Sequence, residues 1–210
     1  MTDYRKAWPA ILLVGPSGCG KTPLGDLLEA KGMGGMCFRH FDFGKILRES
    51  VGKGSGLLTD GERIVVREVL ERGALLEDEH FPIAGKLLAG FIDEAGKGSD
   101  SVIVLNGLPR HIGQAMAIEG TARVRAVVSL DCAADIAWER VNTNAGGDRH
   151  GRGDDTMEQV RYRFRIFRQR TAPLLEYYRR CGVPLVSLDV KKETTAGDML
   201  ALLEARYPLG

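Results

Sequence analysis

An apolar run, residues 10–14, leads directly into a glycine-rich turn that ends in Lys21 and Thr22. The turn reads Gly-Pro-Ser-Gly-Cys-Gly-Lys-Thr over residues 15–22, which matches Gly-x-x-x-x-Gly-Lys-Thr in full, and residues 24–30 after it read as a helix. Glycines allow successive backbone N–H groups to converge on one anion at the start of such a helix. A strand, this turn and a helix in that order predict a phosphate-binding loop.

The expected phosphate-binding residues are those of the turn itself: Gly15, Pro16, Ser17, Gly18, Cys19, Gly20, Lys21 and Thr22. In such a loop the lysine reaches the β- and γ-phosphates of a nucleoside triphosphate, and the threonine hydroxyl contacts the associated magnesium ion. The competing interpretation is a chance match in a solvated loop, and the flanking strand and helix argue against it.

Composition limits the class of protein. The 210 residues, 44% hydrophobic and 27% charged, are enough to bury one substantial core. A net charge of +1 gives no overall attraction to nucleic acid or membrane, so any anion site must be local. No apolar run has the length of a membrane span or a signal peptide, and the four cysteines form no Cys-x-x-Cys pair. We therefore expect a cytoplasmic protein with reduced cysteines and no zinc site, which binds neither nucleic acid nor membrane.

Apolar strand-like runs alternate with helical stretches along the chain, at residues 10–14, 36–41, 101–105, 125–130 and 184–188. This alternation predicts an α/β fold with a five-stranded parallel sheet and helices on both faces. The stretch 42–100 is far longer than one crossover needs, so it should form a helical piece of its own. Residues 144–155 combine glycines with charged residues and predict a mobile loop, a candidate lid.

Arginines recur where loops and helices follow the predicted strands. Arg48 follows the second strand, Arg110 ends the segment Asn-Gly-Leu-Pro-Arg after the third, and Arg140 follows the fourth. Arg152 falls in the candidate lid and Arg163 in the helix after it. Each alone would be read as a surface or salt-bridge arginine. Because guanidinium groups are always charged and bind phosphate oxygens in pairs, several of them beside a phosphate loop favour phosphoryl transfer.

In order along the chain, these segments resemble the adenylate kinase and nucleoside monophosphate kinase family. The resemblance rests on the phosphate loop, residues 15–22, and on five further matches: residues 43–48, residues 73–79, residues 106–115, Glu139 with Arg140, and residues 152–163. It implies a three-layer P-loop NTPase fold with a short lid. The implied division is a core of residues 1–42, 95–143 and 156–210, an insertion of residues 43–94 that binds a nucleoside monophosphate, and a lid of residues 144–155.

The resemblance also implies what individual residues do. ATP would be held by residues 15–22, with Arg140 near its base. The acceptor monophosphate would be held by Phe43, Arg48, Leu76, Arg110 and Gln114. Within that set Arg48 and Arg110 would bind its phosphate, and Gln114 its base. The implied catalytic residues are Lys21, Arg110, Arg152 and Arg163, the last two coming over the transferring group as the lid closes.

The implied activity is transfer of the γ-phosphoryl group of MgATP to AMP or another nucleoside monophosphate by a monomer, with Thr22 as the metal-contacting residue. Several positions depart from the family pattern. Lys45 and Asn106 stand where the family usually carries aspartates that hold magnesium-bound waters, and Phe43 stands where threonine is usual. These departures leave two alternatives open: a catalytically impaired nucleotide sensor of the same fold, and a P-loop kinase of another small molecule.

Overall fold

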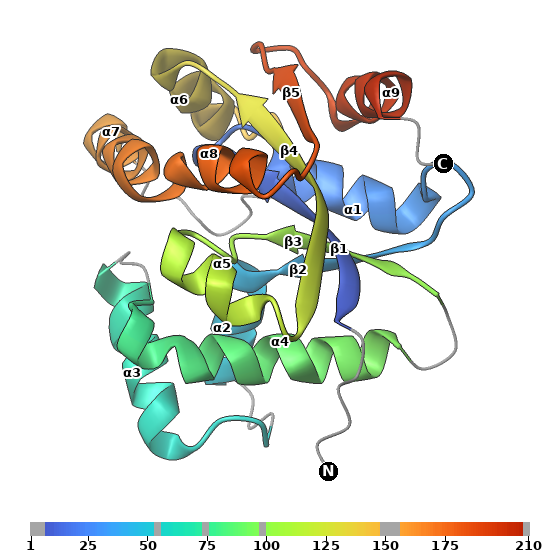
Figure 1. The fold of residues 1–210 in the computed structure, drawn as a ribbon. Coiled ribbons are helices and arrows are strands. Elements are labelled where there is room, and N and C mark those ends of the chain that lie inside the picture. Colours follow the sequence, from blue (N-terminus) through green and yellow to red (C-terminus); the bar gives the residue numbers. More distant parts are fainter. Residues whose placement is uncertain (1–6, 53–55, 73–75, 97–99, 148–155, 208–210) are drawn as a thin grey trace.

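The structure, a computed structural model, describes residues 7–52, 56–72, 76–96, 100–147 and 156–207. Its centre is a parallel sheet of five strands in the order β2-β3-β1-β4-β5 (Figure 1). The strands are β1 (Trp8–Val14), β2 (Phe38–Asp42), β3 (Val102–Asn106), β4 (Ala122–Asp131) and β5 (Leu185–Asp189). Each predicted strand is present, with ends shifted by a few residues, and the predicted α/β fold is confirmed.

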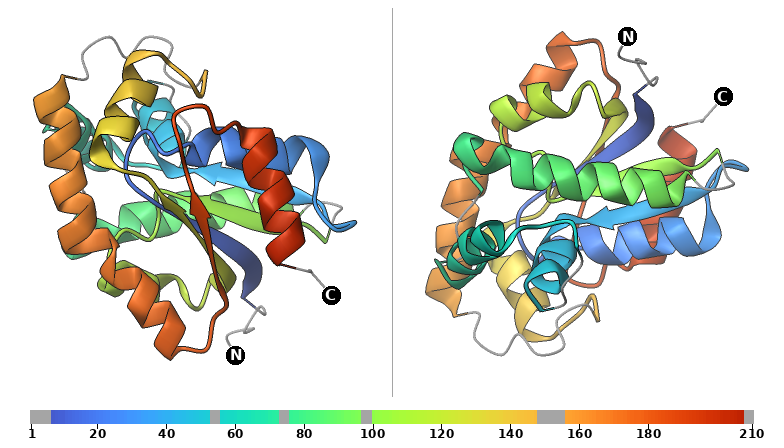
Figure 2. Two further views of the ribbon diagram at one scale, coloured as in Figure 1. Left: turned by 90° about the horizontal axis from the view of Figure 1, so that it is seen from above. Right: turned by 90° about the horizontal axis from the view of Figure 1, so that it is seen from below.

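Helices cover both faces of the sheet (Figures 1 and 2). One face is covered by α1 (Lys21–Lys31) and α9 (Ala196–Arg206), which contact each other. The other is covered by α4 (Phe81–Ala95), α5 (Ile112–Ile118) and α8 (Pro173–Arg180). Successive residues of a strand point to opposite faces of the sheet. In β1, Ile11 and Leu13 therefore pack toward α1 and α9, whereas Leu12 packs toward α4, α5 and α8. Burial on both faces explains why the strands read as continuous apolar runs.

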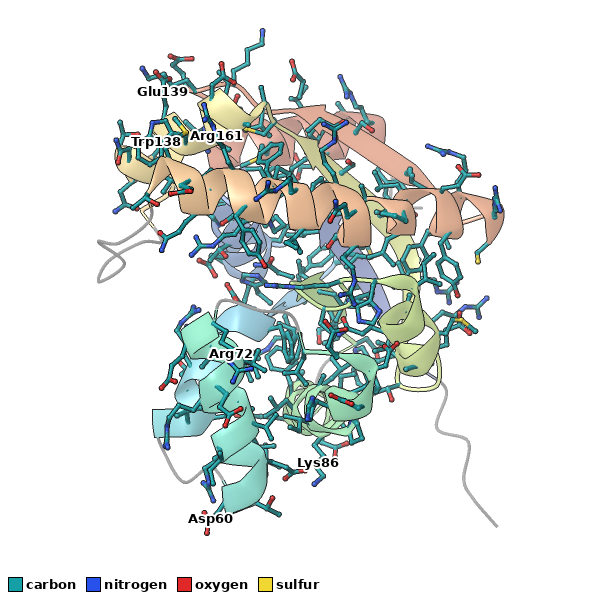
Figure 3. All side chains as sticks on the ribbon, turned by 90° about the vertical axis from the view of Figure 1, so that its left-hand side faces the viewer. Asp60, Arg72, Lys86, Trp138, Glu139 and Arg161 are labelled. Atoms are coloured by element: carbon teal, nitrogen blue, oxygen red, sulfur yellow. The ribbon has the colours of Figure 1, made fainter. Side chains whose placement is uncertain are left out.

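The long connection between β2 and β3 is helical, as predicted. It contains α2 (Phe43–Gly52), α3 (Asp60–Arg72), the short η1 (Asp78–His80) and α4. α2 and α3 pack together beside the sheet, whereas α4 continues beneath it and buries an apolar stripe that includes Leu87, Leu88 and Ile92. In Figure 3, Asp60 of α3 and Trp138 lie at opposite extremes of the molecule.

The last third of the chain forms the wall that faces this connection. It contains α6 (Ala134–Asn142), α7 (Met157–Ile166), the π-helical turn η2 (Phe167–Thr171) and α8. A capping box starts α7, in which the Thr156 hydroxyl accepts from the Gln159 N–H and the Gln159 side chain accepts from the Thr156 N–H. In the described part of the chain, none of the helices has the length and apolar character that crossing a bilayer requires.

Candidate active site

A pocket of about 520 Å³ lies where β1, β2 and β3 end. Its lining contains most of the residues that the sequence singled out: Gly15, Pro16, Ser17, Gly18, Gly20, Lys21, Thr22, Phe43, Arg48, Leu76, Arg110, Gln114, Arg140 and Arg163. Cys19 is fully buried beneath the loop and does not line the pocket. Arg152 and most of the expected lid, residues 148–155, lie outside the described residues. The carboxyl edge of an open parallel sheet is the usual place for a ligand in this class of fold.

The turn between β1 and α1 has the geometry of a phosphate-binding loop. Gly18 and Gly20 have φ angles of 92° and 94°, in the left-handed region that favours glycine. A Cβ at Gly15 would lie 2.6 Å from the Cys19 Sγ and 2.8 Å from the Leu130 carbonyl oxygen, so a side chain does not fit there. The Lys21 ammonium donates to the carbonyl oxygens of Gly15 and Pro16, each at 2.7 Å, and so lies across its own loop at the pocket.

Strand register brings a hydroxyl, a carboxylate and an amide together beside this loop. Asp42 pairs directly with Asn106, and both end their strands. The Thr22 hydroxyl donates to Asp42 Oδ2 at 2.8 Å. The Asn106 Nδ2 lies 3.1 Å from the Thr22 Oγ1 and 3.4 Å from Asp42 Oδ2. The sequence left open whether Asp42 could replace the missing carboxylates, because only the pairing of β2 with β3 places it here.

Burial by itself would raise the pKa of Asp42, but opposing effects outweigh it and leave that pKa below its ordinary value. The opposing effects are hydrogen bonds from the Lys45 N–H and the Thr22 hydroxyl, and the positive charges of the His40 ring, in its protonated form, and of Arg48. Asp42 is therefore anionic at neutral pH. Its Oδ1 accepts a hydrogen bond from the Lys45 N–H at 2.9 Å. Because α2 begins at Phe43, this bond makes Asp42 the N-cap residue of α2.

The buried His40 ring lies within hydrogen-bond distance of the Asn106 side chain. The His40 Nε2 lies 3.3 Å from the Asn106 Nδ2, and its Nδ1 lies 2.8 Å from Asp26 Oδ1. When Nε2 accepts from the amide, Nδ1 carries the proton and donates to Asp26. The ring packs against α1 at Gly25, where a Cβ would approach His40 Nε2 to 2.3 Å. No local pattern in the sequence indicated this support, since it joins three separate elements.

Arginines approach the pocket from three elements. Arg48 comes from α2, Arg110 follows β3, and Arg163 comes from α7. Burial lowers the pKa of the Arg110 guanidinium, the charge of Asp42 raises it, and the charge of Arg163 lowers it further. Arg110 is thus close enough to both Asp42 and Arg163 to be affected by their charges. The Arg110 Nε also donates to the Gly107 carbonyl at 3.0 Å, which orients the guanidinium.

Gln114 lies at the buried end of the pocket with its amide in a fixed orientation. Its Oε1 accepts the Arg110 N–H at 2.8 Å, and its Nε2 donates to the Leu76 carbonyl oxygen at 2.8 Å. A reversed amide would place like groups together at both contacts. One N–H and one lone pair of the amide remain for another group.

Arg140 is almost completely buried, with 4% of its surface exposed. Its Nε donates to the Gly18 carbonyl at 3.2 Å, and its Nη1 lies within 2.9 Å of the carbonyl oxygens of Lys191, Lys192 and Thr194. These bonds brace the phosphate loop against the segment between β5 and α9. The expected contact of Arg140 with the ATP base stays a prediction.

The glycine-rich loop, its lysine and the surrounding arginines define the fold and site of a P-loop phosphotransferase. Comparison with known proteins narrows the class: the family model described as "Adenylate kinase" matches residues 13–183, and the chain belongs to the adenylate kinase family.

Curated relatives match along most of the chain. An adenylate kinase from Synechococcus sp. (strain WH7803) is 31% identical over 192 residues, covering 89% of this chain and 92% of that protein. An adenylate kinase from Xanthomonas campestris pv. campestris (strain B100) is 32% identical over 180 residues, covering 82% and 86%. Among solved structures, a gluconokinase from Sinorhizobium meliloti 1021 has a TM-score of 0.53 and 18% identity, covering 96% of this chain and 92% of that one. That structural likeness concerns the fold alone, while the family makes this chain a nucleotide kinase.

Proposed function

We propose that this protein transfers the γ-phosphoryl group of MgATP to a nucleoside monophosphate, with AMP as the expected acceptor, and releases ADP and a nucleoside diphosphate. The observation that carries the proposal is the shared pocket. The phosphate loop with Lys21 lines one part of it, and Arg48 and Arg110 line another.

The two groups of residues suit two different anions. On the donor side, the backbone of residues 15–20 and the Lys21 ammonium would bind the β- and γ-phosphates. On the acceptor side, Arg48 and Arg110 would bind the monophosphate, and the free N–H and lone pair of Gln114 would hydrogen-bond its base. Leu47, Val69 and Leu70 line the pocket as well and offer apolar surface to a base.

Transfer requires positioning and charge neutralisation more than covalent chemistry by the protein. An oxygen of the acceptor phosphate forms a bond to the γ-phosphorus, and the bond from that phosphorus to the β–γ bridging oxygen breaks. The acceptor oxygen is already anionic, so no strong general base is needed. Lys21, Arg110 and Arg163 would stabilise the charge that develops on the transferring group.

Magnesium is expected with ATP, and the pocket offers the oxygen donors that this cation prefers. The Thr22 hydroxyl follows the loop lysine, as the metal-contacting residue of such loops does, and an anionic carboxylate lies beside it. When bound, the ion neutralises charge on the β- and γ-phosphate oxygens.

The alternative is a nucleotide sensor without turnover, and Lys45 and Asn106 favour it because neither is a carboxylate. ADP formation separates the two. We expect MgATP-dependent ADP release with at least one of AMP, UMP, CMP, GMP and dTMP, fastest with AMP, and none with the Lys21→Ala variant. Tight binding of ATP and a monophosphate by calorimetry, without ADP formation at any magnesium concentration, would establish the sensor instead.

A further inference from the structure

The pocket contains many cations and few anions. Lys21, Arg48, Arg110, Arg140 and Arg163 line it, whereas Asp42 is the single carboxylate among the described lining residues. A divalent cation in this pocket therefore has one anionic side chain to approach among those residues.

Positions 45 and 106, where the family usually carries carboxylates, add no second anionic group to the pocket. Lys45 is exposed and lies outside the pocket lining, so its ammonium neither supplies an oxygen nor stands in the way of a cation. Asn106 lines the pocket but directs its Nδ2 toward Thr22 and Asp42. An amide donor there stabilises the Asp42 carboxylate, whereas a second carboxylate at the same place would repel it.

The two oxygens of Asp42 have different surroundings, and Oδ2 is the one that lies beside Thr22 and Asn106. Oδ1 is engaged as the cap of α2 through the Lys45 N–H. Oδ2 accepts a hydrogen bond from the Thr22 hydroxyl. The hydroxyl hydrogen therefore points at Asp42, and a lone pair of the Thr22 oxygen is left for a cation.

We infer that Asp42 has taken over the carboxylate function of positions 45 and 106 in this chain and, with Thr22, holds the divalent cation of the bound nucleotide. His40 has a positioning role, since it orients Asn106, which in turn contacts both oxygen donors. This inference rests on the proposed function, because it requires that the pocket bind a nucleoside triphosphate.

Calorimetry of ATP binding, with Mg²⁺ and with EDTA, tests the inference without turnover. The measured quantity is the metal enhancement, the factor by which Mg²⁺ tightens ATP binding. Asp42→Asn keeps a good helix cap, removes the charge and replaces one carboxylate oxygen by an amide NH2 group. We expect this substitution to reduce the enhancement by about tenfold or more, while binding in EDTA stays equal or tightens because an anion beside the triphosphate is gone.

Asp42→Ser, also a good cap without charge, repeats the test should the asparagine variant fold poorly. Electron paramagnetic resonance of Mn²⁺ with a non-hydrolysable ATP analogue gives a second readout, in which both variants should lose protein-bound Mn²⁺. Lys45→Asp is the matched control and should leave the enhancement within about twofold of wild type, because its side chain lies outside the pocket.

Three results would overturn the inference. Unchanged metal enhancement in both Asp42 variants would do so, with the proposed function intact if the wild type binds MgATP. A large rise in the metal enhancement in Lys45→Asp would show that a carboxylate at position 45 can reach the cation. Absence of ATP binding by the wild type in both conditions would instead refute the proposed function, and the inference with it.

Discussion

Glu77 and Arg170 form a bidentate ion pair that joins the β2–β3 connection to the π-helical turn η2. The distance from Nη1 to Oε1 is 3.0 Å, and that from Nη2 to Oε2 is 2.8 Å. Leu76 and Thr171, the neighbours of these residues in sequence, line the pocket. The pair therefore joins the two walls of the pocket at one point.

Removing this pair should loosen the acceptor side of the pocket more than the donor side. We expect Arg170→Met to raise the KM for the acceptor monophosphate several-fold and to change the KM for ATP little. Both side chains are partly exposed, so the loss in free energy of unfolding should be only about 0.5 kcal/mol. Arg168→Met is the control, since Arg168 belongs to the same turn η2 but is exposed and does not line this pocket. Equal acceptor KM values in the two variants would contradict the expectation.

The same pair predicts a pH dependence. The hydrogen bond from Arg170 lowers the pKa of Glu77, and desolvation opposes this only in part. The stabilisation is therefore complete above the ordinary glutamate pKa of about 4.3 and is lost as the pH falls through the lowered value. Thermal unfolding should show a small difference between wild type and Arg170→Met at pH 7 that disappears in strong acid. A difference that grows on acidification would show the sign to be wrong.

Lys21→Ala should abolish turnover and preserve the fold. Among the described residues the ammonium hydrogen-bonds to two carbonyl oxygens and the Cys19 thiol, all in its own loop, so little core packing is lost. Removal of a cation that stabilises transferred charge should reduce kcat by at least about a hundredfold. Stopped-time ADP assays and thermal unfolding measure the two effects. Retained turnover would place the ATP phosphates elsewhere.

Gln114→Glu should weaken acceptor binding and lower stability. Glutamate can accept the Arg110 N–H but cannot donate to the Leu76 carbonyl, which leaves two oxygens facing each other in a buried place. An unmet buried acceptor costs about 1–3 kcal/mol. Urea unfolding and a KM series over the five monophosphates would measure both effects. An unaltered acceptor KM would remove Gln114 from the proposed base contact.

Gly25→Ala should destabilise the protein although alanine favours a helix. The new Cβ would lie 2.3–2.6 Å from the His40 ring, which Asp26 and Asn106 hold in place. Overpacking of this kind costs about 1–3 kcal/mol. The matched control is Gly61→Ala in α3, where a Cβ would meet no atom of the described residues within 4 Å apart from its chain neighbours and the backbone of its own helix, and stability should rise by up to about 1 kcal/mol. An equal change in the free energy of unfolding for the two variants, measured in urea, would mean that the His40 ring shifts without cost to make room for the new methyl group.

Local sequence patterns were sufficient to predict the strands and the phosphate loop. An apolar run is buried wherever it lies in a parallel sheet, and the glycines at 18 and 20 meet a conformational need within their own turn. The order of motifs along the chain also indicated that Arg48, Arg110 and Arg163 share a site, and the structure brings all three to one pocket.

Only the tertiary structure decided how that site is completed. Asp42 meets Thr22 because β2 pairs with β3 in one particular register, and a shift of one residue would turn its side chain to the other face. The exposure of Lys45 and the π-helical turn that carries Arg170 likewise depend on packing between distant segments. Backbone sterics and hydrophobic periodicity act between near neighbours and can be read from sequence. The contacts that complete the site join residues far apart in the chain, and they exist only once the sheet and its helices have packed.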